Sequence, residues 1–417
     1  MKSNSGLSIQ LENCLGSISA EIERVVLAFS GGIDSCVLMH LLNAHPAPLI
    51  ILPWHINHGL QAVADEMEAF CRSVADRYKL DIEVSHLNLD PDMANLESEA
   101  RKARYALFEQ ALTPTDCLMT AHHAEDQAET LLLNILRGSG SSGLRGIAYR
   151  RTIGSSILVR PLLEISRADI LAYAQRHRLK WYDDPSNKSQ RFNRNYLRHQ
   201  VIPKIKSRWP GYLGSIRSVI TIQAETQQVL EELGAQDYQQ VRYQSETETR
   251  DLLCRNTFQQ LSYSRQKNLI RYWLKKYDCA SLPQSRLNEL IRQLNSRTDS
   301  MPVVSGSGYE IRVYNQCLYI VYKNSQVPLR AGYEFNHSAG LNIKELDLKL
   351  ERKSIFLRLN QKDSGQSIKL KFRLKNQGPS PDSHRLKRLF QKHKIPPWKR
   401  PVTPQVYLDD ELAGLWF

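Results

Sequence analysis

A glycine-rich turn between two apolar runs constrains the fold of this chain more than any other feature. The turn joins an apolar run at 25–29 to another at 36–42, and it reads Ser30-Gly31-Gly32-Ile33-Asp34-Ser35. The first run predicts a buried strand and the second predicts a helix. Glycines let the main chain approach an anion closely, and the N–H groups and positive dipole at the start of the helix then face it. The sequence therefore predicts a phosphate-binding turn.

The polar residues of this turn suit a nucleotide. Ser30 and Ser35 add hydroxyl donors, and the carboxylate of Asp34 could hold a metal ion on the phosphates. The common phosphate loop is excluded because no lysine follows Gly32, and the G-x-G-x-x-G fingerprint of nicotinamide enzymes is absent. An ordinary glycine turn between a strand and a helix is the alternative.

The first half of the chain alternates strand-like and helix-like segments. Strands are predicted at 24–30, 49–57, 82–88 and 116–121, and helices at 35–44, 62–79, 95–112 and 124–137. The strands are apolar without alternation, as in a parallel sheet that is covered on both faces. This pattern predicts a doubly wound α/β domain with a mostly parallel sheet. Ligands of such folds bind at the carboxyl ends of the strands, which is where the glycine-rich turn lies.

The remainder of the chain is long enough for further domains. A continuous helix is predicted at about 215–235, followed by helices and by strand-like runs near 309–322. The last part is strand-like and basic, since residues 351–400 hold fifteen Lys or Arg against three acids. We therefore expect a catalytic domain at 1–213, a linker helix and a mainly helical middle domain at 214–330, and a small basic α+β domain at 338–417.

Composition narrows the class of protein. The formal net charge of +13 suits a polyanionic partner such as nucleic acid. The seven cysteines form no C-x-x-C pair, which favours a reducing compartment and no structural zinc or iron–sulfur site. The sequence has neither a run of about 18 apolar residues nor a signal-peptide core, so we expect a cytoplasmic protein without a membrane span.

A second polar cluster follows the predicted strand at 116–121. Asp126 and Glu129 are three residues apart and therefore share one face of the helix that begins there. Two carboxylates aimed at the cleft could bind an ammonium group or Mg²⁺. The alternative is that they only favour the helix N-terminus through its dipole. His122 and His123 lack a third ligand at a zinc spacing, so a zinc site is not favoured.

Other polar segments border the same predicted edge of the sheet. His55–Leu60 follows the second strand and could frame an adenosine, although a structural role is favoured for His55 itself. Arg194 and Arg198 lie four residues apart on one helix face and could match phosphates or a carboxylate, with a solvated basic face as the alternative. A further helix carries side chains that are either surface charges or part of the rim of the cleft, namely Glu99, Arg101, Arg104 and Tyr105.

Together these segments resemble one branch of the PP-loop ATP pyrophosphatases, the tRNA(Ile)-lysidine synthetases. The resemblance runs through nearly the whole chain in the family's order. It is carried by the turn at 30–35, His55–Leu60, Glu99–Tyr105, Ala121–Thr130, Arg137–Gly140, Arg160–Leu163, Asp184–Asn187, Arg194–Arg198, Lys387–Phe390, Ile395–Arg400 and Tyr407–Asp410. Segment 236–325 is too generic to compare. Segment 358–384 departs most from the family, because it lacks a glycine-aspartate-arginine turn.

The resemblance implies a two-step ligation that forms a carbon–nitrogen bond. ATP adenylates the carbonyl oxygen at position 2 of the wobble cytidine in an isoleucine tRNA with a CAU anticodon, and pyrophosphate leaves. The ε-amine of free L-lysine then attacks that carbon and expels AMP, which gives lysidine. The implied small molecules are thus ATP, Mg²⁺ and lysine, and the implied macromolecular partner is the tRNA.

The resemblance also implies roles for individual residues. The turn from Ser30 to Ser35 would hold the phosphates, and Asp34 would bind Mg²⁺. Asp126 and Glu129 would bind the lysine ammonium or remove its proton, and Arg194 would contact a phosphate or the intermediate. The basic C-terminal segment and the long helix would grip the tRNA backbone. The oligomeric state is left open, with a homodimer as one option.

Two other functions stay open at this point. Another PP-loop tRNA-modifying enzyme, such as a thiolase, would usually carry a cysteine pair, which this sequence lacks. A non-catalytic RNA-binding protein could keep a vestigial nucleotide fold. The intact turn together with Asp126 and Glu129 argues against such decay.

Overall fold

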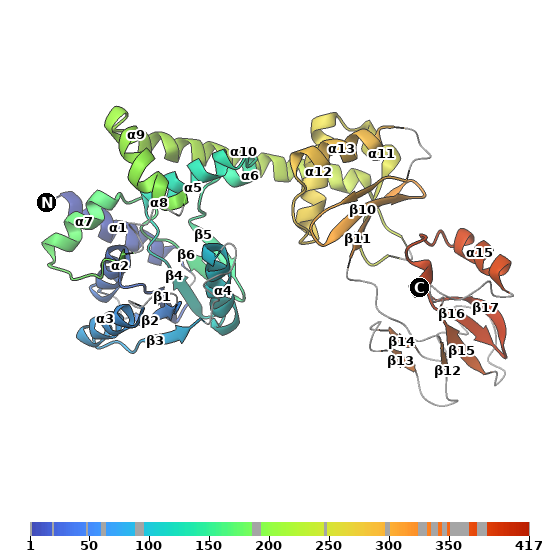
Figure 1. Cartoon of the computed structure of the whole chain (residues 1–417), viewed down its shortest axis with the longest axis horizontal. Helices are drawn as coiled ribbons and strands as arrows, with labels where there is room; N and C mark the ends of the chain where they lie inside the picture. Colours follow the sequence, from blue (N-terminus) through green and yellow to red (C-terminus); the bar gives the residue numbers. More distant parts are fainter. Residues whose placement is uncertain are drawn as a thin grey trace. The chain divides into compact units, whose positions relative to one another are not determined.

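The computed structural model contains two compact units, Met1–Gln227 and Gln228–Phe417, drawn in Figure 1. The structure describes residues 2–18, 21–46, 49–59, 64–87, 96–185, 193–245, 248–296, 301–323, 332–334, 341–343, 348–350, 367–372 and 382–416. Ser186, Asn187 and most of segment 358–384 lie outside the described residues. The contacts divide the chain within one long helix, and the three domains expected from the sequence stay a prediction.

A six-stranded sheet forms the centre of the first unit, with strand order β3-β2-β1-β4-β6-β5. Its strands are β1 (Arg24–Ala28), β2 (Ile50–Asn57), β3 (Glu83–His86), β4 (Asp116–Met119), β5 (Arg150–Ile153) and β6 (Ser156–Val159). Neighbouring strands are parallel except for β5 and β6, which pair antiparallel at one edge. The doubly wound, mostly parallel sheet predicted from the sequence is confirmed.

Helices cover both faces of this sheet (Figure 1). Alternate side chains of a strand point to opposite faces, and apolar residues on both faces of β1 need such a cover. Val25 and Leu27 of β1 face one core, and Val26 faces the other. The first core includes side chains from α1 (Lys2–Gly16), α2 (Ile33–Asn43), α3 (Ala64–Arg77) and α7 (Arg167–Arg176). The second core includes Phe108 of α4 (Leu96–Ala111). Since α2 and α4 each follow a parallel strand, both helices begin at the carboxyl edge of the sheet.

Most helices form where local signals predict them. Ser166 caps α7, because its hydroxyl accepts the N–H of Asp169 at 3.2 Å. The sequence does not predict α1, whose first residues are rich in Ser, Asn and Gly; this helix buries Leu7 and Leu11 in the first core. The glycine- and serine-rich stretch at 138–146 contains one short helix, α6 (Ser141–Leu144).

A group of helices after the sheet brings later residues back to the start of α5 (Ala124–Leu136). This group consists of α8 (Asn193–Tyr196), a π-helix η2 (Leu197–Val201) and α9 (Ile202–Arg208). Ala128 of α5 packs in one cluster with Ile202 and Tyr212. π-helical turns are rare and frequently occur at functional sites. Here the π-helix directly follows α8, which contains Arg194, and it includes Arg198.

The second unit contains two larger sheets, with strand orders β7-β8-β11-β10-β9 and β12-β15-β16-β17, and a separate β13-β14 pair. Its strands are β7 (Arg242–Tyr243), β8 (Leu252–Cys254), β9 (Val303–Ser305), β10 (Tyr309–Tyr314), β11 (Cys317–Tyr322), β12 (Gly332–Glu334), β13 (Leu341–Ile343), β14 (Leu348–Leu350), β15 (Ile368–Lys371), β16 (Gln405–Leu408) and β17 (Glu411–Leu415). Its helices are α11 (Arg255–Gln260), α12 (Tyr263–Lys276), α13 (Gln284–Leu294), α15 (Ser383–Lys392) and the short η4 (Arg400–Val402). The expected long helix is α10 (Tyr212–Val241), which carries residues of both units. No helix among the described residues has the length and apolar character needed to cross a membrane.

Candidate active site

The predicted phosphate-binding turn lies between β1 and α2, at the carboxyl edge of the sheet (Figure 1). Gly31 has φ +75°, and a Cβ at this position would lie 2.9 Å from Cys71 Sγ, so only glycine fits without strain. Gly32 is the N-cap residue of α2. Because a glycine cap has no side chain to occupy them, the first N–H groups of α2 can bind an anion.

Two contacts to main-chain carbonyl oxygens hold the turn in place. His55 Nδ1 lies 3.0 Å from the carbonyl oxygen of Phe29, the residue just before the turn. The N–H of Tyr182 donates to the carbonyl oxygen of Gly31 at 2.9 Å. His55 is buried and therefore supports the main chain of the turn, which agrees with the structural role favoured for it from the sequence.

Asp34 lies in the first turn of α2 and has one oxygen without a partner. Asp34 Oδ2 lies 3.9 Å from His123 Nε2, whereas Oδ1 is buried and has no hydrogen-bond partner among the described residues. Burial raises the pKa of the Asp34 carboxyl, and the charge of His123 only partly opposes this rise. A buried carboxylate oxygen beside a phosphate-binding turn is a donor that suits a hard cation.

Asp126 and Glu129 form an ion-pair network with Arg194 and Arg198. Asp126 Oδ1 accepts from Arg194 Nη2 at 2.9 Å and from Arg198 Nη2 at 3.0 Å. Glu129 Oε2 accepts from Arg194 Nε at 2.6 Å, and its Oε1 accepts from Arg198 Nε at 2.5 Å. Glu129 is fully buried. The two arginines do share one face, as the sequence predicts, and this face points at the two carboxylates.

This pairing differs from the expected arrangement, in which Asp126 and Glu129 were available to a lysine ammonium. Both oxygens of Glu129 already accept hydrogen bonds from guanidinium groups. The reason is tertiary: α8 and η2 lie against α5, so Arg194 and Arg198 reach carboxylates more than 60 residues away in sequence.

His123 connects Asp34 to this network. Its Nε2 lies 3.5 Å from Asp126 Oδ2 and 3.9 Å from Asp34 Oδ2, and its Nδ1 lies 3.1 Å from Glu125 Oε2. Burial disfavours the charged ring, but Asp126, Glu125 and Asp34 together raise the pKa of His123. Burial likewise disfavours ionised Asp126, yet His123, Arg194 and other cations hold the pKa of its carboxyl well below the usual range.

The structure thus brings together all four residues expected to take part in catalysis, Asp34, Asp126, Glu129 and Arg194. The sequence offered Arg198 only as a match for phosphates or a carboxylate, and it considered His123 only as a zinc ligand that was not favoured. A usable signal existed for His123, because it is the N-cap residue of α5 and its main-chain N–H donates to Asp126 Oδ2 at 2.9 Å. No group of three or more metal-ligating side chains occurs within the described ranges.

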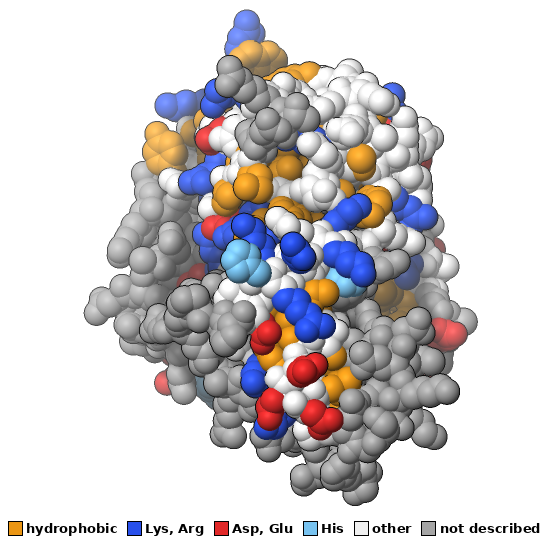
Figure 2. Space-filling view, turned by 90° about the vertical axis from the view of Figure 1, so that its right-hand side faces the viewer, with side chains coloured by type: hydrophobic (Ala, Val, Ile, Leu, Met, Phe, Trp, Pro, Cys, Tyr) orange, Lys and Arg blue, Asp and Glu red, His pale blue; other side chains and the backbone are white. Residues whose placement is uncertain are grey.

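The second unit presents a basic face on α15. Leu386 and Phe390 are buried on one side of this helix, while Lys387, Arg388 and Lys392 are exposed on the other. Figure 2 faces the side of the molecule where α15 lies in Figure 1, and it shows Lys and Arg side chains gathered near its centre. An exposed cluster of this kind suits a polyanion.

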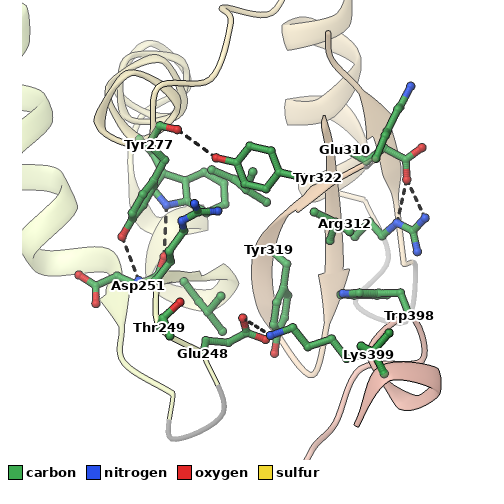
Figure 3. Close-up of a pocket in the computed structure, with 17 residues that line it drawn as sticks. Glu248, Thr249, Asp251, Tyr277, Glu310, Arg312, Tyr319, Tyr322, Trp398 and Lys399 are labelled. Carbon is green, nitrogen blue, oxygen red and sulfur yellow. Dashed lines mark hydrogen bonds and ion pairs between the residues drawn. The ribbon is translucent and has the colours of Figure 1, made fainter. Parts of the chain in front are cut away.

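A cavity of about 420 Å³ lies in the second unit between β10, β11 and the segment before η4 (Figure 3). Trp398 packs edge-on against Tyr319, with ring centroids 5.4 Å apart, and Arg312 lies over its ring at 5.2 Å. Lys399 donates to Glu248 Oε2 at 2.6 Å. Trp398 therefore packs against its neighbours, and Tyr407 is buried, so both side chains contribute to packing.

The fold, the glycine-rich turn and the carboxylates beside it define a PP-loop nucleotide-binding domain, and residues 4–205 match the PP-loop domain family. Residues 253–319 match the TilS substrate binding domain, and residues 366–416 match the TilS substrate C-terminal domain.

Three relatives that match more than nine-tenths of this chain are all named tRNA(Ile)-lysidine synthase. The tRNA(Ile)-lysidine synthase of Coxiella burnetii is 37% identical, over 93% of this chain and 87% of that protein. The tRNA(Ile)-lysidine synthase of Serratia proteamaculans is 33% identical, over 99% and 94%. That of Legionella pneumophila (strain Paris) is 33% identical, over 94% and 90%. The chain belongs to the tRNA(Ile)-lysidine synthase family.

Proposed function

We propose that this protein ligates lysine to the wobble cytidine of an isoleucine tRNA with a CAU anticodon, with cleavage of ATP to AMP and pyrophosphate. The observation that carries this proposal is the shared location of the phosphate-binding turn, Asp34 and the Asp126–Arg194 network at one edge of the sheet. Nucleotide activation and attack by an amine need an anion site and ionisable groups side by side. The ligase class, the lysine substrate and the cytoplasmic location belong to the same proposal.

The residues present fit Mg²⁺ bound together with ATP. Asp34 offers a buried oxygen without a protein partner among the described residues. Since Mg²⁺ is commonly held by one or two carboxylates plus substrate phosphates, one carboxylate beside a phosphate-binding turn is sufficient. When bound there, the ion would neutralise charge on the departing pyrophosphate. The turn from Ser30 to Ser35 itself would hold the phosphates through its N–H groups and hydroxyls.

The ion-pair network supports a positioning role for the two acids. We assign to Asp126 and Glu129 the task of holding Arg194 and Arg198, with Arg194 directed at a phosphate or at the adenylated intermediate. A direct role of either acid in binding the lysine ammonium, or in removing its proton, requires that an arginine first moves away. Arg194 is in any case a fixed cation, because despite burial Asp126 and Glu129 raise its pKa.

The thiolase alternative receives no support from the cysteines near the turn. Burial raises the pKa of the Cys36 thiol to about 12 and also raises that of Cys71. Thiols with raised pKa are poor nucleophiles at neutral pH. A sulfur-transfer step would require a reactive thiolate at this edge.

The test is a reconstituted reaction with the purified protein, ATP, Mg²⁺, radiolabelled lysine and the CAU isoleucine tRNA. We expect lysine incorporation into the tRNA, with AMP and pyrophosphate as the other products. The same tRNA with a GAU anticodon is the matched control and should incorporate no lysine. Formation of ADP, or no incorporation into a correctly folded CAU tRNA, would refute the proposal.

A further inference from the structure

A second group of arginines surrounds Tyr105 at the carboxyl edge of the same sheet. The guanidinium carbons of Arg101 and Arg104, both on α4, lie 5.0 and 5.9 Å from the centroid of the Tyr105 ring. That of Arg151, on β5, lies 4.7 Å from the same centroid. Arg160 follows β6 directly and is only 2% exposed. Three cations therefore lie over one aromatic ring, and a fourth, Arg160, lies at the same edge of the sheet.

These four arginines lack the acidic partners that Arg194 and Arg198 have. Among the described residues, no carboxylate forms an ion pair with Arg101, Arg104, Arg151 or Arg160. Arg160 donates through Nη1 to the carbonyl oxygen of Ala148, but its Nε is buried without a hydrogen-bond partner in the described part of the chain. Arg160 is buried, Arg104 and Arg151 are half-buried, and Arg101 is exposed. Gathering like charges around a buried guanidinium without counter-charge is costly, so the arrangement indicates an anionic ligand.

Two histidines beside the cluster add no charge of their own. His58 follows β2 and His122 follows β4, at the same edge of the sheet. Burial and the charge of Arg104 lower the pKa of His58 to about 4. Burial lowers the pKa of His122 to about 3, although Asp126 acts in the opposite direction. Both imidazoles are therefore neutral near pH 7 and can donate or accept hydrogen bonds without repelling an anion.

Strand order separates this cluster from the phosphate-binding turn. The turn follows β1, and Arg160 follows β6, with β4 between them. Adjacent strands are about 4.8 Å apart, which places the two features roughly 10 Å from each other along the edge. The arginines that act on Asp34 are Arg167 and Arg198, not those around Tyr105. One phosphate group cannot contact both places, whereas a nucleotide joined to a backbone phosphate can.

We propose that Arg101, Arg104 and Arg160 form a second phosphate site, which binds a backbone phosphodiester of the RNA beside the target nucleotide. This site rests on the proposed function, since it assumes an RNA substrate whose target base reaches the turn. Guanidinium groups match phosphate oxygens in a bidentate manner, and the Tyr105 ring packs against those of Arg101 and Arg104. The other source of phosphate at this edge is ATP, whose phosphates are already assigned to the turn at 30–35.

The test compares Arg104→Ala with Lys102→Ala. Lys102 precedes Arg104 by two residues on α4 and therefore faces the opposite side of the helix. It is exposed and forms an ion pair with Glu99 at 2.7 Å. Its replacement by alanine removes the same charge from the helix without touching the arginine cluster. Dissociation constants are measured for the CAU tRNA at several salt concentrations and for a non-hydrolysable ATP analogue. For Arg104→Ala we expect about tenfold weaker tRNA binding, a salt slope reduced by about 1, and unchanged binding of the ATP analogue. Lys102→Ala should bind both like the wild type.

Two results would overturn the assignment. Weaker binding of the ATP analogue with unchanged tRNA binding would give the site to ATP, and wild-type binding of both ligands by Arg104→Ala would remove the phosphate site altogether. Arg104→Lys, which keeps the charge but loses the bidentate fork, should fall between the wild type and Arg104→Ala; it provides a second variant if Arg104→Ala does not fold. Because these measurements are binding constants, failure of the proposed lysine ligation appears separately, as inactivity of the wild-type protein.

Discussion

Three carboxylates at the candidate site differ in what they contact, and the roles proposed for them follow from this difference. Asp34 keeps a buried oxygen without a partner in the described structure, whereas Glu129 uses both oxygens to bind arginines. Asp126 divides its oxygens between the arginines and the start of α5. A carboxylate with an open oxygen can bind a cation, and a carboxylate that is bonded to two arginines holds them in position.

Replacement of Asp34 tests the first of these roles. Asp34→Ala should reduce the rate of pyrophosphate release at least about a hundredfold, because the variant loses the carboxylate that would hold Mg²⁺ against the negative charge of the leaving pyrophosphate. Binding of tRNA, measured by filter retention, should stay within about twofold of the wild type, since the basic surfaces are untouched. Loss of tRNA binding in this variant would show that Asp34 has been given the wrong role.

Replacement of Glu129 tests the second role. Glu129→Ala removes the main acceptor of two largely buried guanidinium groups, and we expect a loss of about 3 kcal/mol in the stability of the first unit. Glu164→Ala is the matched control, because Glu164 is half exposed and lies 3.9 Å from Arg217; its effect should stay below about 1 kcal/mol. Urea unfolding followed by circular dichroism gives both values. Equal effects of the two substitutions would contradict the network.

At the scale of elements, the turn between β1 and α2 contains two glycines with different roles. Gly31 is needed for the shape of the backbone, and Gly32 leaves space for a phosphate at the start of α2. Gly31 has a positive φ and no room for a Cβ beside Cys71. Gly32 has an extended backbone, and a Cβ there would meet only Ser30 Oγ, at 3.6 Å. The two neighbours in sequence therefore serve the turn for different physical reasons.

This contrast gives a prediction with a built-in control. Gly31→Ala should lower the melting temperature by several degrees, because strain and the contact with Cys71 together cost about 1–3 kcal/mol. Gly32→Ala should melt like the wild type but bind ATP more weakly, since its methyl group stands where a phosphate approaches the start of α2. Differential scanning fluorimetry with and without an ATP analogue measures both effects. A melting temperature lowered equally by both substitutions would rule out this division of roles.

At the scale of the whole molecule, the net charge of +13 includes basic clusters in both units. The exposed residues Lys387, Arg388 and Lys392 lie on α15 in the second unit, and the arginines around Tyr105 lie in the first. A tRNA is large enough to contact separate basic surfaces at once. Sequence selection then depends on unpaired anticodon bases, which can be read individually.

The α15 surface can be tested by removing its charge. Substitution of Lys387, Arg388 and Lys392 together by alanine should weaken tRNA binding and reduce the slope of log affinity against log salt by about 2–3. The matched control keeps the charge with Lys387→Arg, Arg388→Lys and Lys392→Arg, and should keep the wild-type slope. Unchanged affinity of the alanine variant would exclude α15 from the tRNA-binding surface.

Much of the fold could be predicted from the sequence because its signals are local. The strands β1 to β4 and the helices α2 to α5 fall where apolar runs and glycines indicate them, and Ser166 caps α7 as its spacing with Asp169 predicts. The helix α1 could not be predicted, since its propensity is poor and its stability comes from Leu7 and Leu11 packing on the sheet.

The sequence by itself determined the phosphate-binding turn, the parallel sheet and the presence of paired acids and paired arginines, because each is a pattern within a few residues. Only the tertiary structure decided that Arg194 and Arg198 bind Asp126 and Glu129, and that the arginines around Tyr105 have no such acids among the described residues. The physical reason is that the charge state and availability of a side chain depend on which distant groups surround it, and the packing of helices on the sheet sets those neighbours.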